Sequence, residues 1–256
     1  MICVKIMGGL GNQLFQYASG YGISKNNNKI LLIDSSSYTT DNLRNFMLDK
    51  YPIKRIFKEP YYKANIHIVD SFEYKPLKFN IHDKVYLEGY FQSEKYFKEY
   101  RKDILKMFKP SKKFLKNIPK RYSFIASSEE TLSVHIRRGD YLNSNGYHPI
   151  QSLEYYEEAI KRIPHKHLVV FSDDLEWCKN NLKYENMTFV DGLEDFEEIW
   201  LMSLCKNNII ANSSFSWWGA WLNENPSKRV IAPKKWFGDF VNLPTKDIYA
   251  DGFEAI

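Results

Sequence analysis

The stretch Leu132–Tyr141 reads LSVHIRRGDY and joins an apolar run to a polar turn. Its apolar residues recur at every second position up to Ile136, which predicts a buried strand that leaves His135 and Arg137 on one face. Short apolar runs recur at 168–171, 188–190, 209–211 and 230–232, and helical patterns lie near 151–163, 174–182, 195–206 and 215–224. Strands alternating with helices predict an α/β fold with a parallel sheet covered on both faces.

The first half of the chain opens with the same pattern. The elements expected there are a strand at 2–7, a helix at 12–25 and strands at 30–33 and 85–87. Few elements are expected within 35–84. The segment 110–119 begins and ends with proline, which is typical of a linker. We therefore expect two domains, residues 1–118 and 119–256.

The composition is that of a globular protein. Of 256 residues, 44% are hydrophobic and 26% are charged, and this balance excludes a disordered chain. The three cysteines lie far apart without a metal-type spacing, which suits a reducing compartment. No signal-peptide pattern and no apolar run of membrane-spanning length are present, so we expect a cytoplasmic protein.

Positive charge is concentrated in one segment. Residues 101–121 hold nine basic side chains and one acid, Asp103, and their first half has the spacing of an amphipathic helix. One interpretation is a solvated surface beside the linker. The other is a patch that contacts the anionic inner face of a membrane peripherally. A non-catalytic binder of membranes or nucleic acids is therefore an alternative class of protein.

Two adjacent arginines, Arg137 and Arg138, leave the predicted strand and are followed by Asp140. Arginine presents fixed pairs of donors that suit phosphate oxygens. Because one aspartate cannot balance two arginines, we expect a bound anion here rather than only an ion pair that closes the turn. Asp140 either acts as a base or only positions a guanidinium, in particular that of Arg138.

A glycine turn, GGLGNQ at residues 8–13, follows the first strand and opens a helix. Gly9 and Gly11 permit a ligand to approach the backbone and the free amides of the helix start. Asn12 and Gln13 add directional hydrogen-bonding groups. Asp34 follows the next strand and resembles the acid of a dinucleotide site, so a dinucleotide-dependent oxidoreductase is an alternative, as is a plain structural turn.

Polar residues follow two further strands. Asp174 has the position of a helix cap, which leaves Asp173 as the candidate for a functional contact. The helix start at 213–216 offers free amides and hydroxyl groups to an anion. Its residues are Ser213, Ser214, Phe215 and Ser216. Together with the arginines, this helix start predicts a diphosphate held from two sides.

Glu198 lies near the start of the helix expected at 195–206. A carboxylate there can accept two hydrogen bonds from the edge of a base such as guanine. Two acids that flank one residue are a common way to hold a divalent cation, and no Asp-x-Asp occurs in this chain. We therefore expect no metal site.

Four motifs of this chain, in this order, resemble the α-1,2-fucosyltransferases, which include bacterial surface-glycan enzymes and animal blood-group H transferases. The motifs are GGLGNQLFQY at 8–17, LEGYFQSEKYF at 87–97, HIRRGDY at 135–141 and NSSFSWWG at 212–219. The arginine motif is shared with α-1,6 and protein O-fucosylating enzymes, so these linkages are alternatives. The glycine turn and the tryptophan segment favour the 1,2 group.

The resemblance implies two Rossmann-like domains that face each other across a cleft, the GT-B arrangement, with the donor held mainly by the C-terminal domain. It implies inverting transfer of fucose from GDP-β-L-fucose to the 2-hydroxyl of an oligosaccharide or lipid-linked galactoside in surface-glycan synthesis, without metal or cofactor. Arg137 would grip the β-phosphate, His135 would line the nucleotide, and 214–216 would hold the diphosphate. Glu198 would read guanine.

Overall fold

The computed structural model describes residues 1–40, 43–53, 64–127 and 130–256. The chain forms two compact units. The N-terminal unit comprises Met1–Phe108 and Leu243–Ala250, and the C-terminal unit comprises Lys109–Asn242 and Asp251–Ile256. These units differ from the expected domains at residues 109–118 and 243–250, and the domain bounds stay a prediction.

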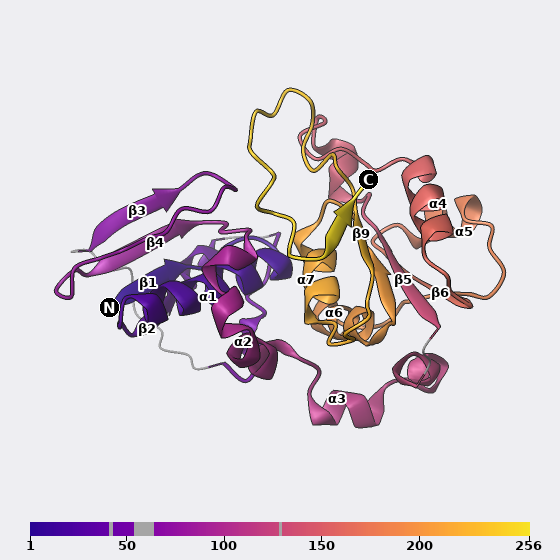
Figure 1. The fold of residues 1–256 in the computed structure, drawn as a ribbon, viewed down its shortest axis with the longest axis horizontal. Coiled ribbons are helices and arrows are strands. Elements are labelled where there is room, and N and C mark those ends of the chain that lie inside the picture. Colours follow the sequence, from indigo (N-terminus) through magenta and orange to yellow (C-terminus); the bar gives the residue numbers. More distant parts are fainter. Residues whose placement is uncertain (41–42, 54–63, 128–129) are drawn as a thin grey trace. The chain divides into compact units, whose positions relative to one another are not determined.

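The N-terminal unit is built on a four-stranded sheet in the order β2-β1-β4-β3, with every pair parallel. Its elements are β1 (Ile2–Lys5), α1 (Leu10–Asn26), β2 (Leu31–Asp34), β3 (Asn65–Val69), β4 (Val85–Gly89) and α2 (Arg101–Phe108). Figure 1 shows α1 alongside this sheet. The central strands β1 and β4 are rich in buried apolar side chains, as expected for a parallel sheet.

The C-terminal unit is built on a six-stranded parallel sheet in the order β10-β9-β8-β5-β6-β7. Its strands are β5 (Thr131–Ile136), β6 (His167–Ser172), β7 (Met187–Phe189), β8 (Asn207–Ile209), β9 (Val230–Ala232) and β10 (Phe253–Ala255). Its helices are α3 (Lys112–Asn117), α4 (Leu153–Arg162), α5 (Leu175–Asn181), α6 (Asp195–Leu204) and α7 (Ser214–Leu222).

Helices cover both faces of this second sheet, which confirms the α/β class with parallel sheets (Figure 1). Val134 and Ile136 of β5 pack into one apolar cluster with residues of α4 and α5, including Tyr156. Helices α6 and α7 lie on the other side. Trp217 and Trp218 of α7 are fully buried, so both belong to the core.

Three elements were not expected from the sequence. Strand β3 lies within residues 35–84, where few elements were expected, and β10 extends the second sheet at the end of the chain. The expected linker 110–119 contains the short helix α3, which Ser111 caps by accepting a hydrogen bond from the amide of Phe114. No helix among the described residues is long and apolar enough to cross a membrane.

Close packing of α1 depends on Gly22. A Cβ atom at this position would lie 2.0 Å from the carbonyl oxygen of Tyr96, in a rigid backbone turn. We expect Gly22→Ala to lower the free energy of unfolding by about 2 kcal/mol, because overpacking outweighs the better helix propensity of alanine. Urea denaturation measures this change.

The matched control is Gly20→Ala in the same helix. There the new Cβ would meet side-chain atoms of Leu31 and Val4 at 2.9 and 3.0 Å, and side chains can move away. We expect the stability of this control to stay within about 1 kcal/mol of the parent. An equal loss in both variants would contradict the packing argument.

Candidate active site

The candidate site lies at the carboxyl edge of the second sheet, where three neighbouring strands end. Arg137 follows β5, Asp173 follows β6, and Ser213 follows the end of β8 by a few residues. β5 lies between β6 and β8 in the sheet, so these three ends are adjacent. In parallel α/β sheets this edge is where ligands bind.

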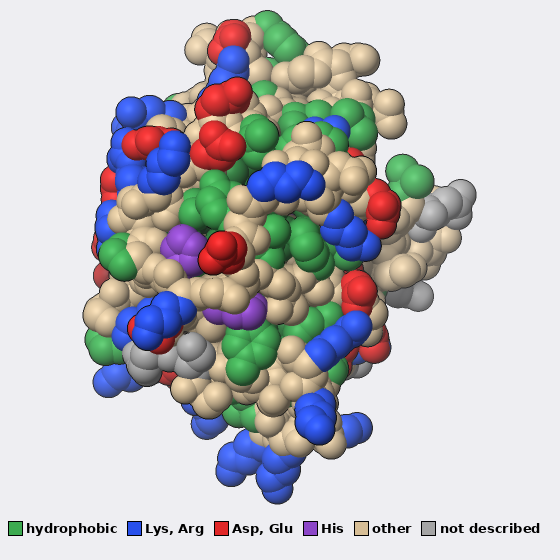
Figure 2. Space-filling model, turned by 90° about the vertical axis from the view of Figure 1, so that its right-hand side faces the viewer, with side chains coloured by type: hydrophobic (Ala, Val, Ile, Leu, Met, Phe, Trp, Pro, Cys, Tyr) green, Lys and Arg blue, Asp and Glu red, His purple; other side chains and the backbone are tan. Residues whose placement is uncertain are grey.

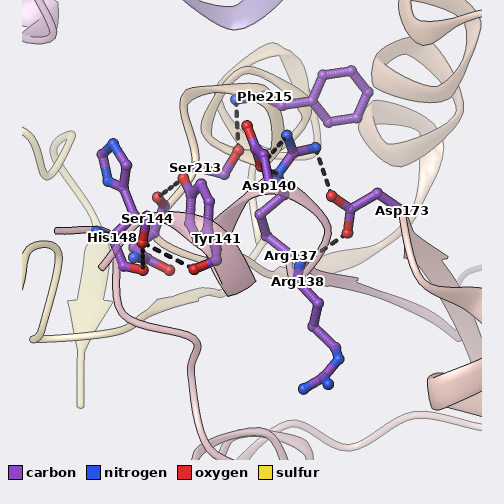
Figure 3. Close-up of polar contacts among 10 residues, drawn as sticks. Arg137, Arg138, Asp140, Tyr141, Ser144, His148, Asp173, Ser213 and Phe215 are labelled. Atoms are coloured by element: carbon purple, nitrogen blue, oxygen red, sulfur yellow. Dashed lines mark hydrogen bonds and ion pairs between the residues drawn. The ribbon is translucent and has the colours of Figure 1, made fainter. Parts of the chain in front are cut away.

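Arg137 is held by two carboxylates (Figure 3). Its Nε and Nη2 donate to Oδ1 of Asp140 at 3.0 and 2.6 Å. Its Nη1 lies 3.0 Å from Oδ2 of Asp173. The guanidinium carbon also lies 5.5 Å from the ring centre of Tyr141. The guanidinium is therefore fixed in one orientation before any ligand arrives.

The charge of Arg137 is secured by this arrangement. Burial lowers the pKa of Arg137, but the charges of Asp173 and Asp140 outweigh burial, so the pKa is raised. The Arg137 side chain remains 21% exposed and that of Asp140 49% exposed. A ligand can thus reach the permanently charged guanidinium of Arg137. Its partner Asp140 is also accessible.

Arg138 points away from this cluster. Its Nε donates to Oδ2 of Asp174 at 3.0 Å, and its guanidinium carbon lies 4.2 Å from the ring centre of Trp177. Asp174 also caps α5 by accepting from the amide of Trp177, as expected from the sequence. The prediction that Asp140 positions Arg138 is wrong, because the side chain of Arg138 pairs with Asp174 and Asp140 pairs with Arg137.

The expectation that the two arginines exceed the nearby negative charge is wrong. It counted only Asp140, whereas Asp173 and Asp174 also pair with Arg137 and Arg138. Both acids follow β6, far from the arginines in sequence, and β5–β6 pairing brings them together. The case for an anion therefore rests on the accessibility of Arg137 rather than on unbalanced charge.

Asp173 joins the two strand ends. One oxygen faces Arg137, and the other accepts a hydrogen bond from the backbone amide of Arg138 at 2.9 Å. A Cβ atom at Gly139 would lie 2.5 Å from Oδ2 of Asp173. The glycine of the arginine motif is therefore needed so that the turn can approach this carboxylate.

His135 lies behind the arginine turn, on the opposite face of β5 from the apolar cluster. It is fully buried, and burial followed by the charge of Arg137 lowers its pKa to about 3. Its ring centre lies 5.5 Å from that of Phe215, and its Nδ1 has no hydrogen-bond partner among the described residues. His135 is thus a neutral ring near physiological pH, suited to lining the site rather than carrying a proton.

The start of α7 completes this edge. The hydroxyl of Ser213 accepts a hydrogen bond from the amide of Phe215 at 3.3 Å, and the buried hydroxyl of Ser216 donates to the carbonyl of Ser213. Ser214 and Phe215 are half-buried. The hydroxyl of Tyr141 donates to the carbonyl of Asn212 at 2.8 Å and so ties the arginine turn to this helix start.

Glu198 lies in the first turn of α6, half-buried. Burial, followed by the charges of Asp195 and Asp173, raises the pKa of Glu198 to about 8. Its neighbour Glu197 has a different role, because its side chain accepts from the amide of Glu194 and forms a capping box. The structure thus places an acid with a raised pKa within electrostatic range of Asp173.

Sequence reasoning missed the aromatic support of the site. The ring of Tyr141 stacks on that of His148 at 4.8 Å with an angle of 16°, and His148 also contacts Tyr147 and Phe237. Burial lowers the pKa of His148. The loop around His148 carries no periodic pattern, so nothing in the sequence places this ring beside the arginine motif.

The glycine turn belongs to the N-terminal unit and follows β1. Gly9 caps α1, and Gly11 is buried in its first turn. Gln13 donates to the carbonyls of Gly8 and Asn45 and accepts from the amide of Met47, so it anchors another loop. Asn12 accepts from Gln92. Ligand contacts by these residues stay a prediction.

Asp34, the acid expected at a dinucleotide ribose, is buried in the same unit. Its carboxylate accepts hydrogen bonds from the hydroxyl of Tyr86 at 2.7 Å and from the amide of Ser36 at 2.8 Å. These contacts give Asp34 a structural role in holding β2 to β4. Among the described residues, no group of three His, Cys, Asp or Glu side chains is placed to hold a metal ion.

The chain is similar in sequence to known glycosyltransferases over nearly its whole length. A model of glycosyl transferase family 11 matches residues 1–254. An α-1,2-colitosyltransferase of Escherichia coli is 35% identical, over 93% of this chain and 92% of the relative. The O-antigen biosynthesis glycosyltransferase WbnK of Escherichia coli is 31% identical, over 91% of this chain and 93% of the relative.

Among solved structures, the fold is similar to that of NodZ from Bradyrhizobium, an α-1,6-fucosyltransferase whose crystal was soaked with GDP-fucose. The TM-score is 0.54 at 13% identity, over 95% of this chain and 99% of NodZ. This likeness concerns the fold alone. The family match and the two bacterial relatives cover nearly the whole chain, and the chain therefore belongs to glycosyl transferase family 11.

Proposed function

We propose that this glycosyltransferase moves L-fucose from GDP-β-L-fucose to the 2-hydroxyl of a galactoside, with inversion at the sugar carbon. The observation that carries the proposal is the accessible guanidinium of Arg137, oriented by Asp140 and Asp173 beside the start of α7. Two bacterial relatives, named as an α-1,2-transferase and an O-antigen glycosyltransferase, support the 1,2 linkage and a role in surface-glycan synthesis.

The charge of the leaving group determines what the site must do. Breaking the bond between sugar and phosphate leaves negative charge on GDP. Arg137 would take this charge at the β-phosphate, and the amides and hydroxyls at the start of α7, Ser213 to Ser216, would hold the diphosphate. These groups are fixed before the reaction, so little reorganisation is needed, and no metal ion or cofactor is required in this mechanism.

The attacking 2-hydroxyl must lose its proton as the new bond forms. Asp140 is the candidate base, because its carboxylate is 49% exposed beside Arg137. The ion pair with Arg137 gives Asp140 a second role, which is to orient the guanidinium. His135 is less suited to the task, since burial and Arg137 keep it neutral and enclosed.

Glu198 would read the guanine base through its two carboxylate oxygens. Hydrogen bonds from the guanine N1–H and amino group require the ionised carboxylate, whereas the pKa of about 8 favours the protonated form in the free protein. Binding of GDP would then release a proton from Glu198. This coupling gives the proposed role a measurable signature.

The finer architecture is also part of the proposal. We infer that the two units are Rossmann-like domains of GT-B type facing across a cleft, with the acceptor held on the N-terminal side near Gly9, Gly11, Asn12 and Gln13. A galactoside in an oligosaccharide or on a lipid carrier fits this role. An α-1,6 or O-fucosyl linkage remains the alternative, since NodZ has a similar fold. The structural contacts of Asp34 disfavour the oxidoreductase alternative.

We expect Arg137→Lys to lower kcat about a hundredfold or more while the protein stays folded. Lysine keeps the charge but cannot reproduce the planar pair of donors, and one preorganised donor is typically worth about 3 kcal/mol. Turnover with GDP-fucose and a galactoside, together with a melting curve, measures the effect.

The matched variant is Arg138→Lys, which alters an arginine held by Asp174 and Trp177. We expect it to lose less than about tenfold in kcat and to lose stability instead, through the weakened contact with α5. If Arg137→Lys turns over normally and Arg138→Lys does not, the roles assigned to the two arginines are reversed.

We expect the affinity for GDP to rise with pH, by about tenfold per pH unit below 8, and to level off above it. Only the fraction with ionised Glu198 would bind, and that fraction grows until pH passes the raised pKa. Calorimetric titration from pH 6.5 to 9 checks this. The control is Glu198→Gln, which removes the ionisable side chain at this position and leaves the titration of GDP itself unchanged.

Two outcomes would argue against guanine reading by Glu198. The first is an affinity that falls with pH, which would mean that the protonated acid donates to the base. The second is an equal affinity for GDP and UDP, because uracil lacks the donor pair that guanine presents.

We expect a chelator to leave turnover unchanged, since Arg137 and the start of α7 take the place of a cation. Initial rates with and without excess EDTA give the answer, and EDTA presaturated with calcium serves as the control. A loss of rate that manganese specifically restores would refute the metal-independent mechanism.

A further inference from the structure

One charged surface of the C-terminal unit has no part in the proposed chemistry. It is the outward side of α3, formed by Lys112, Lys113, Leu115 and Lys116, and it is called the α3 surface below. All four side chains are exposed, with Leu115 at 45%. Figure 2 shows Lys and Arg side chains gathered at the lower end of the view, the end at which Figure 1 places α3.

The orientation of α3 is fixed by one buried side chain. Phe114 is 7% exposed, and its ring packs 5.2 Å from that of Trp200 in α6. At about 100° per residue, Lys112 and Lys116 point directly away from Phe114, and Lys113 and Leu115 flank them. The lysines therefore project together from a helix that is anchored to the unit carrying the candidate active site.

Among the residues that the structure describes, acidic partners are found for the neighbours of this surface but not for its lysines. Within residues 109–121, Lys109 pairs with Glu224 and Arg121 with Asp191. No acid among the described residues pairs with Lys112, Lys113 or Lys116. The sequence contains no acidic residue from 104 to 127. A partner of opposite charge can thus approach without displacing an internal ion pair.

We propose that the α3 surface docks onto an anionic lipid membrane. Lysines at a membrane surface attract acidic headgroups, and an apolar side chain beside them can enter the interfacial region. Leu115 has this position. Residues 109–121 expose no large aromatic side chain on which bases could stack, which favours lipid over single-stranded nucleic acid.

Membrane docking specifies the class of acceptor. A galactoside on a lipid carrier is confined to the membrane surface, and docking would bring the C-terminal unit to the same surface. Only the conclusion that the acceptor is lipid-linked rests on the proposed function. Lipid binding itself requires no turnover, so the two proposals can fail separately.

The test uses the full chain and vesicles made of equal parts phosphatidylglycerol and phosphatidylcholine, with phosphatidylcholine vesicles for comparison. We expect co-sedimentation only with the anionic vesicles, weakened by salt. Lys112→Gln, Lys113→Gln and Lys116→Gln together should lower the partition coefficient about a hundredfold. Leu115→Ser should lower it about tenfold, including at high salt.

The matched control neutralises three exposed lysines elsewhere in the same unit, Lys161→Gln, Lys166→Gln and Lys183→Gln. It removes the same charge, and we expect its vesicle binding to stay within about threefold of the parent. Both triple variants should keep their melting temperature and their kcat/KM on a soluble galactoside. A drop in melting temperature confined to the α3 variant would show a structural role instead.

Three results would overturn the proposal. One is equal vesicle binding by the two triple variants, which would mean that net charge rather than the α3 surface is responsible. Another is unchanged vesicle binding by the α3 variant while its binding to RNA is lost, which would make this a nucleic-acid surface. The third is equal binding of the parent to neutral and anionic vesicles. Vesicle binding without any transferase activity would instead sink only the proposed function.

Discussion

The contact between Arg137 and Asp173 is the constraint on which the C-terminal unit's site depends. It joins the ends of β5 and β6, it orients the guanidinium, and through the second oxygen of Asp173 it fixes the backbone of Arg138. Gly139 has to lack a side chain so that the turn can lie against this carboxylate. Without these acids the guanidinium, whose side chain is only 21% exposed, would carry an uncompensated charge, which proteins rarely tolerate.

This arrangement gives Arg138 a structural role and leaves the guanidinium of Arg137 accessible to a ligand. Arg138 packs against the start of α5, where it pairs with Asp174 and contacts the ring of Trp177. Arg137 stays at the open side with Asp140, whose carboxylate is half exposed. Two neighbours in sequence thus have different tasks, because alternate residues at a strand end face opposite sides of the sheet. A site of this kind is preorganised toward an anion in the absence of any ligand.

The sequence predicted what depends on local pattern. The alternation of apolar runs and helical patterns predicted the parallel sheets, and the residue types at the helix starts predicted the cap at Asp174 and the start of α7. Each of these features depends on residues that lie close together in the chain. The sequence did not predict that Asp173 and Asp174 balance the arginines, since that pairing requires β5 and β6 to be neighbours. It also missed β3, a short strand at the edge of its sheet, although Asn65–Ile68 alternate polar and apolar side chains as a strand does. The run is too short to stand out from the irregular sequence around it.

Asp173 also links the two ends of the proposed nucleotide site electrostatically. The same carboxylate that holds Arg137 contributes to the raised pKa of Glu198. A diphosphate at Arg137 would add negative charge nearby and oppose the ionisation of Glu198 further. A guanine base can offset this cost by donating two hydrogen bonds to the ionised carboxylate. Asp173 therefore couples the two ends of the proposed site, because charge bound at Arg137 changes the proton affinity of Glu198.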